Sequence, residues 1–208
     1  MEVGTKLRTI TIVTIAIAIQ LGSVSSLSAQ PTILIVRHAE KVETWPGGIL
    51  DAYHPLSATG VARAESLATV FGLDEIAGIY GSRTTRTVHT GLPLSQKLGL
   101  PIMEATACQD TSRILDFFGE VIRNHRSDQN VLLISHSDVI PHLLLKAGLP
   151  DSCWQEQGIT GSPGTELLIE GYSNIWRVDL SRSLSGGCEG FSRTNYWVRS
   201  AESVGTGK

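Results

Sequence analysis

The chain has 208 residues, enough for one domain and little more. Hydrophobic residues make up 41% and charged residues 18%, an ordinary globular composition that excludes a largely disordered chain. The formal net charge of −3 argues against a nucleic-acid partner, because a surface that binds nucleic acid is normally basic.

Residues 1–29 have the layout of a secretory signal peptide. Lys6 and Arg8 precede an apolar run over 10–21, and small residues follow, so that cleavage fits after residue 29 or after Ser26. The run is about twelve residues, short for a membrane span, and an uncleaved anchor is the alternative. We therefore expect an exported protein, periplasmic or secreted, without stable membrane insertion once the signal is removed.

Strands and helices are expected to alternate from residue 32 to 148. Apolar, often β-branched runs predict buried strands at 33–36 and 131–134, and short strands are expected at 77–80 and 102–104. Apolar spacing, caps and breakers predict helices from Ser57 to Gly72, from Ser82 to Leu98 with a kink or break at Pro93, through Ile114–Ile122, and from Pro141 to Gly148. Such alternation is typical of a parallel sheet with helices on both faces.

The pattern changes after Pro150. Segments 166–170, 174–180 and 191–198 read as strands joined by turns rich in Gly and Ser, which predicts a partly antiparallel edge. The predicted fold class is therefore α/β, a three-layer sandwich whose mostly parallel sheet ends in a partly antiparallel C-terminal edge.

The chain has three cysteines: Cys108, Cys153 and Cys188. Export would place them in an oxidising compartment, and the odd count leaves at least one thiol without an intramolecular partner. Cys153 and Cys188 both lie in the loop-rich C-terminal part and are the favoured pair. No cysteine or histidine spacing indicates a zinc site, so no metal is expected.

Three polar clusters each follow a predicted strand. They are Arg37-His38-Ala39-Glu40 after the first strand, Ser82 to Thr87 after the second, and Ser135-His136-Ser137-Asp138 after the fourth. Open α/β sheets bind ligands beyond the carboxyl ends of their strands. The three clusters are therefore expected to converge on one site.

Two arginines and two histidines suit a phosphoryl group. Arg37 and Arg86 offer planar forks of donors that match phosphate oxygens. A neutral imidazole is a competent nucleophile, and the nearby cations should keep His38 neutral near pH 7. Together with His136, the arginines supply positive charge that other phosphotransferases take from Mg²⁺. We therefore predict phosphotransfer through His38 without a cofactor.

The segments ILIVRHAEK, LSATGVARA, SRTTRTVHT and VLLISHSDVIP resemble the histidine phosphatase superfamily, the phosphoglycerate-mutase-like fold, in its small phosphatase type. The resemblance runs from Ile33 to Leu180 and gives a domain over 30–202 with a flexible tail at 203–208. It implies that His38 becomes phosphorylated. It also implies that Arg37, Arg86 and His136 hold the phosphoryl oxygens. Ser82 and Asp138 are expected as further substrate-binding residues.

The sequence departs from the mutases in one interval. Between Arg86 and His136 it lacks their longer acidic insertion. Mutase activity is therefore less favoured than phosphatase activity, and the usual general acid is missing. The remaining candidates are Glu40, Glu104, Asp110 and Asp138. Glu40 is favoured slightly, while Asp138 is as well explained by helix capping.

The segment 41–55, with Trp45 and Tyr53, is expected either to fold over the pocket or to form a plain surface loop. The other histidines of the chain match no catalytic position. They are His54, His89, His125 and His142.

The leading expectation is an exported phosphatase that acts on a phosphorylated small molecule, either a phosphomonoester or a related phosphoryl donor. The alternatives are a non-catalytic phosphate- or phosphoprotein-binding module on the same fold, and a mutase-like phosphotransferase. A metal site built from His38, His136, Glu40 and Asp138 is disfavoured, because the two arginines would repel a cation. The sequence leaves the substrate and the oligomeric state open.

Overall fold

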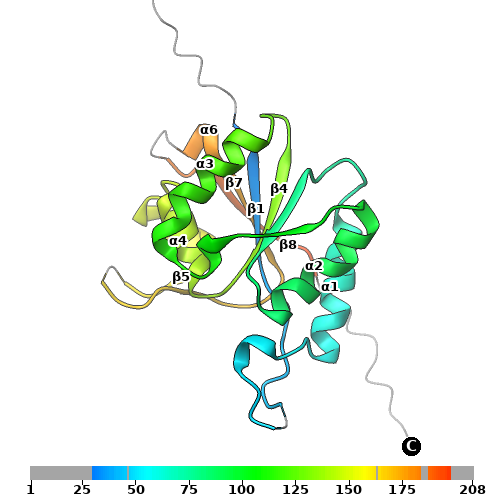
Figure 1. The fold of residues 1–208 in the computed structure, drawn as a ribbon. Coiled ribbons are helices and arrows are strands. Elements are labelled where there is room, and N and C mark those ends of the chain that lie inside the picture. Colours follow the sequence, from blue (N-terminus) through cyan, green and yellow to red (C-terminus); the bar gives the residue numbers. More distant parts are fainter. Residues whose placement is uncertain (1–29, 46, 163, 184–186, 198–208) are drawn as a thin grey trace, which may run out of the picture.

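The computed structural model describes residues 30–45, 47–162, 164–183 and 187–197. Its centre is a six-stranded sheet with the order β3-β2-β4-β1-β7-β8 (Figure 1). The strands are β1 (Thr32–Arg37), β2 (Gly78–Gly81), β3 (Ile102–Glu104), β4 (Asn130–Ser135), β7 (Asn174–Asp179) and β8 (Phe191–Asn195). The expected signal peptide and tail lie outside the described residues.

The sheet is parallel over its first four strands and antiparallel at one edge. Strand β1 pairs parallel with β4, which pairs parallel with β2, and β3 extends the same direction. Strand β7 runs antiparallel to β1, and β8 antiparallel to β7. This arrangement confirms the predicted fold class.

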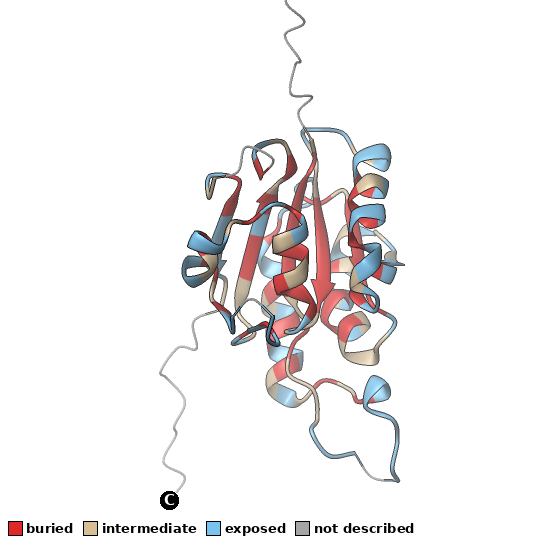
Figure 2. Ribbon diagram, turned by 90° about the vertical axis from the view of Figure 1, so that its left-hand side faces the viewer, coloured by how far each residue is buried: buried red, intermediate tan, exposed pale blue. Residues whose placement is uncertain are grey.

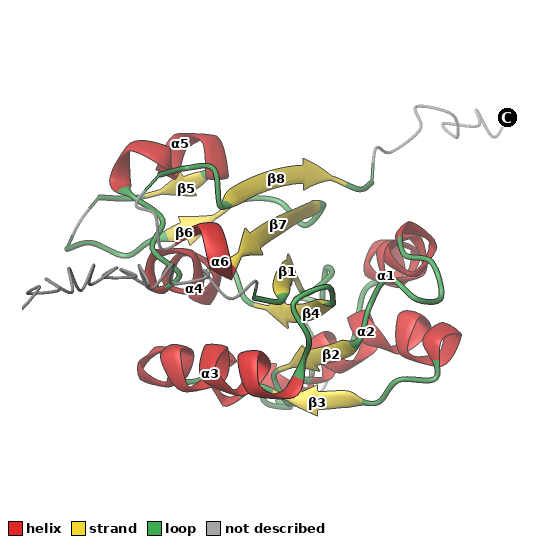
Figure 3. Cartoon of the chain, turned by 90° about the horizontal axis from the view of Figure 1, so that it is seen from above, coloured by secondary structure: helices red, strands yellow, loops and turns green. Residues whose placement is uncertain are grey.

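Helices cover both faces of the sheet (Figure 3). The longer ones are α1 (Ala58–Val70), α2 (Thr85–Leu98), α3 (Ile114–Asn124) and α4 (Val139–Lys146), and the short ones are α5 (Trp154–Gln157) and α6 (Leu180–Ser183). Single 3-10 turns are η1 (Asp51–Tyr53), η2 (Thr106–Cys108), η3 (Thr111–Arg113) and η4 (Asp151–Cys153).

Strand β1 shows why the core has two halves. Successive side chains of a strand point to opposite faces. Ile33 and Ile35 therefore join the cluster formed with α3 and α4, whereas Leu34 and Val36 join the cluster formed with α1 and α2. The central strands are buried throughout this three-layer arrangement (Figure 2).

The start of α2 differs from the prediction. The N-cap residue is Thr84 rather than Ser82, and the Ser82 hydroxyl donates to the Thr87 hydroxyl. The helix also continues through Pro93 to Leu98, so the expected break does not occur. Helix α1 begins as predicted, with the Ser57 side chain accepting a hydrogen bond from the backbone of Gly60.

Helix α4 and the region after it also correct two predictions. The strand expected at 166–170 is the short β6 (Leu168–Ile169), which pairs with β5 (Ile159–Thr160) in a separate two-stranded sheet. The antiparallel edge of the main sheet therefore consists of β7 and β8. Helix α4 begins at Val139, two residues before Pro141.

The favoured disulfide is present. Cys153 and Cys188 are joined, and Cys108 is a buried free thiol whose pKa burial raises to about 11. Among the described residues, none of the helices is both long and apolar enough to span a bilayer.

Candidate active site

The sheet register brings the two histidine motifs together. Arg37, the last residue of β1, lies opposite Ser135, the last residue of β4, and the backbone N–H of His38 donates to the Ser135 carbonyl at 2.9 Å. The His38 and His136 rings consequently lie edge to face, with 5.1 Å between centroids. Since β2 is the other neighbour of β4, it delivers Ser82 to the same place.

Hydrogen bonds fix the ring of His38 and its tautomer. The side chain is 5% exposed, and its Nδ1 lies 2.8 Å from the carbonyl oxygen of Ala39. A carbonyl oxygen only accepts hydrogen bonds, so Nδ1 carries the proton of the neutral ring. Nε2 therefore has the lone pair, and it accepts a hydrogen bond from Nε of Arg86 at 3.2 Å.

Both histidines of the site are neutral at pH 7. Burial, with smaller contributions from His136, Arg86 and Arg37, lowers the pKa of His38 to about 3. Burial, together with the charges of Arg86 and Arg37, lowers the pKa of His136 to about 4. A neutral His38 can act as a nucleophile, whereas an imidazolium cannot.

Arg37 is oriented by the loop that precedes β7. Its Nη1 donates to the Gly171 carbonyl and its Nη2 to the Tyr172 hydroxyl, each at 3.2 Å. The guanidinium also stacks on the Tyr172 ring, 3.9 Å from the centroid. Nε of Arg37 is buried and has no hydrogen-bond partner within the described part of the chain. A buried, unpaired cationic donor beside His38 is a group that an anionic ligand would satisfy.

Thr90 explains part of the spacing in the second motif. It lies one helical turn after Arg86 in α2, and its hydroxyl donates to the Arg86 carbonyl at 2.7 Å. The same oxygen accepts a hydrogen bond from the backbone N–H of Ala39 at 2.9 Å. Thr90 thus ties the segment after His38 to the helix that carries Arg86.

Ser82 orients His136 rather than standing open to a substrate. Its hydroxyl lies 2.9 Å from Nε2 of His136 and also donates to Thr87 at 2.9 Å. Ser82 and Thr87 are both buried, with 2% and 0% exposure. Ser82, which the sequence predicts to bind substrate, is therefore buried against His136.

Glu40 is engaged by an arginine that the sequence analysis did not single out. Arg63 of α1 donates from Nε to Oε2 at 2.7 Å and from Nη2 to Oε1 at 2.5 Å, and it also stacks on Trp197. Burial opposes ionisation of Glu40, but the hydrogen bonds from Arg63 outweigh it, and the pKa is lowered. A carboxylate held ionised in this way is a poor proton donor, which argues against the favoured role of Glu40.

The other candidate acids are dispersed. Asp138 is exposed at the N-cap position of α4, where its side chain makes no capping hydrogen bond. Glu104 pairs with Arg83 at 2.5 Å, and the Asp110 side chain accepts from the backbone of Ser112. Asp138 and Asp110 share a polar pocket with His142 and Glu166.

The loop over 41–55 reaches the site, although not through its aromatic residues. Trp45 and Tyr53 are 41% and 61% exposed. Instead Asp51, in η1, accepts two hydrogen bonds from Nη1 of Arg86, at 3.1 Å through Oδ2 and at 3.0 Å through its backbone carbonyl. Sequence reasoning missed Asp51, since nothing in the local sequence links it to a residue thirty-five positions later.

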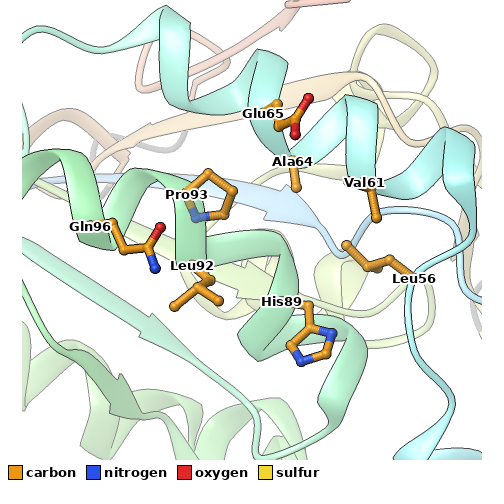
Figure 4. Close-up of a pocket in the computed structure, with 8 residues that line it drawn as sticks. All are labelled: Leu56, Val61, Ala64, Glu65, His89, Leu92, Pro93 and Gln96. Carbon is orange, nitrogen blue, oxygen red and sulfur yellow. The ribbon is translucent and has the colours of Figure 1, made fainter.

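A second, apolar pocket lies between α1 and α2 (Figure 4). It is lined by Leu56, Val61, Ala64, Glu65, His89, Leu92, Pro93 and Gln96, and so contains none of the residues around His38. No group of three or more His, Cys, Asp or Glu side chains among the described residues is arranged to hold a metal ion.

Comparisons with known proteins agree with this geometry. A family model described as the histidine phosphatase superfamily (branch 1) matches residues 33–111, which include Arg37, His38 and Arg86. No curated protein is similar enough in sequence to count as a match.

Several solved structures share the fold. A mycobacterial glucosyl-3-phosphoglycerate phosphatase in complex with inorganic phosphate has a TM-score of 0.52 at 16% identity, over 82% of this chain and 97% of the other. The protein histidine phosphatase SixA in complex with tungstate has a TM-score of 0.51 at 18% identity, over 80% and 94%. A structure titled mycobacterial hydrolase 2 has a TM-score of 0.54 at 15% identity, over 82% and 93%.

At these identities the solved structures show the fold alone. The arginine–histidine pair after β1 lies within the part of the chain, residues 33–111, that is similar to the histidine phosphatase superfamily, whereas the second histidine, after β4, lies beyond it.

Proposed function

We propose that the protein is a phosphatase that hydrolyses a phosphomonoester, or a related phosphoryl donor, through a phosphohistidine at Nε2 of His38. The observation that carries the proposal is the state of this ring. Its Nδ1 proton is held by the Ala39 carbonyl, its pKa is about 3, and its free nitrogen faces the guanidinium of Arg86.

The reaction has two displacements at phosphorus. The Nε2 lone pair of His38 attacks phosphorus, the bond from phosphorus to the leaving oxygen breaks, and that oxygen takes up a proton. Water then attacks the phosphohistidine, the phosphorus–nitrogen bond breaks, and its electron pair returns to Nε2. The water loses a proton, and inorganic phosphate leaves. Two displacements replace one difficult attack by water on the ester.

The positive charges of Arg37 and Arg86 offset the negative charge of the phosphoryl group during transfer. Arg86 donates towards Nε2 from one side, and Arg37 holds an unpaired buried Nε. Fixed donors in a water-poor site stabilise the equatorial oxygens as charge spreads over them. Removing one such donor typically costs about 3 kcal/mol of transition-state stabilisation, so Arg86→Ala should lose at least a hundredfold in kcat, as about 1.4 kcal/mol corresponds to tenfold.

Asp138 is the better placed of the two leading candidates for the proton donor. It is exposed near the site, its charge acts on Arg37 and His136, and no ion pair among the described residues includes it. Glu40, by contrast, is bound at both oxygens by Arg63. We therefore assign proton transfer to the leaving group to Asp138 and a structural role to Glu40.

Export is part of the proposal. The charged and then apolar start of the sequence supports a cleaved signal, and the Cys153–Cys188 disulfide fits an oxidising compartment. The intact mass of protein taken from the cell envelope and medium tests this, and a full-length mass would contradict cleavage.

Rapid quench with a ³²P-labelled phosphomonoester tests the mechanism. Wild-type protein should accumulate label that survives base and is lost in acid, as a phosphoramidate does. His38→Ala should lose the label and orders of magnitude in kcat, while His89→Ala, an exposed histidine of α2, serves as the matched control. Phosphate binding without any labelled enzyme or turnover would support the non-catalytic binding module instead.

A further inference from the structure

We propose that Asp51 is a positioning residue for Arg86, which it anchors by the outer nitrogen so that the inner edge of the guanidinium faces the phosphoryl group. The inference rests on the proposed function, because it gives Asp51 a task in the same phosphoryl transfer.

Different nitrogens of the Arg86 guanidinium contact Asp51 and His38. Nη1 is bound twice by Asp51, through Oδ2 at 3.1 Å and the backbone carbonyl at 3.0 Å, while Nε points to His38 Nε2 at 3.2 Å. A guanidinium is planar and rigid, so fixing Nη1 and Nε fixes the orientation of Nη2 as well.

The edge left to a ligand is the one that forms a two-pronged fork. Nε and Nη2 lie on the same side of a guanidinium, and in Arg63 of this protein they grip both oxygens of Glu40. In Arg86 the same edge is turned towards the reacting nitrogen of His38. A phosphoryl group on Nε2 would therefore meet the fork, while Asp51 holds the opposite nitrogen.

Asp51 is itself held in place. Its Oδ1 forms an ion pair with Lys41, and Nδ1 of His54 lies 3.8 Å from the same oxygen. His54 is buried in the loop, with its ring nitrogens 2.9 Å from the Val42 carbonyl and 3.2 Å from the Ile49 carbonyl. The loop is thus folded around His54 in a way that aims Asp51 at Arg86.

Two other roles fit these contacts less well. The hydrogen bond from Lys41 and the charge of Arg86 lower the pKa of Asp51, so at neutral pH it is a carboxylate with no proton to give. A competitor for phosphate would have to occupy the fork formed by Nε and Nη2, whereas Asp51 binds Nη1.

The test compares Asp51→Ala and Asp51→Asn with Glu43→Gln. Glu43 is an exposed carboxylate of the same loop that also approaches Lys41, at 4.0 Å, and so controls for the loss of loop charge. Calorimetry measures the affinities for orthovanadate and inorganic phosphate. The values of kcat and KM are measured with aryl phosphates of high and low leaving-group pKa, and circular dichroism checks that each variant folds.

Asp51→Ala should lower kcat and vanadate affinity by about 10- to 100-fold, the scale of a misplaced catalytic group, with a smaller change in phosphate affinity. The loss should be the same for good and poor leaving groups. Asp51→Asn keeps an oxygen for Nη1 and should recover a large part of the loss, and Glu43→Gln should match the wild type.

Three results would overturn the role. Tighter phosphate binding by Asp51→Ala would make Asp51 a competitor, a loss confined to poor leaving groups would make it the acid, and values equal to Glu43→Gln would give it no role. None of these three results would contradict a phosphohistidine at His38. A wild type that forms no phosphoenzyme would instead overturn the proposed function itself.

Discussion

Glu40, two residues after the proposed nucleophile His38, forms a two-pronged ion pair with Arg63. Nε and Nη2 of Arg63 donate to the two carboxylate oxygens at 2.7 Å and 2.5 Å, and the Arg63 side chain is 7% exposed. The pair links the segment after β1 to α1. Glu40 lies two residues after His38, which favours it as the acid, whereas its contacts support the structural role that we propose.

Replacing Glu40 by Gln should therefore destabilise the fold more than it impairs the chemistry. The change leaves the buried Arg63 without its counter-charge, and we expect the free energy of unfolding in urea to fall by about 1–3 kcal/mol. Any decrease in kcat should be equal for aryl phosphates with good and poor leaving groups. A decrease that grows with leaving-group pKa would return Glu40 to the role of acid.

Asp138→Asn should show the opposite behaviour. Protonation matters most when the leaving oxygen is basic, so kcat should fall steeply for an alkyl phosphate and little for p-nitrophenyl phosphate. The expected loss for the alkyl substrate is about 100-fold or more, within the usual range for general acid catalysis. Equal losses for both substrates would exclude Asp138, with Glu104 and Asp110 next to be tested.

The two buried histidines should make stability depend on pH. Their pKa values in the folded protein, about 3 for His38 and about 4 for His136, lie below the ordinary value of 6.5. Between pH 6.5 and 4 the unfolded chain therefore binds more protons than the folded one. The stability that these histidines contribute is present above pH 6.5 and is lost as the pH falls towards their folded-state values, by up to about 1.4 kcal/mol per pH unit for each.

Urea unfolding of the wild type and of His38→Gln at pH 4.5, 5.5 and 6.5 measures this slope. The variant removes one titrating group, so its free energy of unfolding should vary less with pH over the same range. The control is His89→Gln, which should keep the wild-type slope because His89 is exposed. An identical slope for all three proteins would contradict the buried neutral state of His38.

Removing the disulfide should cost stability and leave the site intact. Cys153 and Cys188 are 35 residues apart. For a loop of this length, the lower conformational entropy of the cross-linked unfolded chain stabilises the fold by about 4 kcal/mol. Cys153→Ala with Cys188→Ala should lower the free energy of unfolding by about 2–4 kcal/mol and change kcat little. Neither cysteine is among the residues that contact His38, so a large loss of kcat in folded protein would show an unrecognised coupling.

Much of the architecture follows from the sequence alone. The alternating apolar strands and amphipathic helices over 32–148 specify a parallel sheet, because each pattern can bury its apolar residues in only one kind of layer. The three polar clusters after strands β1, β2 and β4 then meet at one edge, because these strands run parallel and lie side by side. The arginine–histidine pair and the second histidine could be recognised from type and position.

The roles of the surrounding residues were decided only by the tertiary structure. The sequence predicts Ser82 as a substrate ligand and Glu40 as the acid, and the structure places the Ser82 hydroxyl against His136 and the Glu40 carboxylate against Arg63. Asp51 and Tyr172 reach the arginines from loops that carry no motif. Local sequence determines which way a strand or helix faces. Hydrogen bonds between residues 23, 35 or 135 positions apart depend on how those elements pack against one another. These contacts determine the charge and the protonation state of each group in the site.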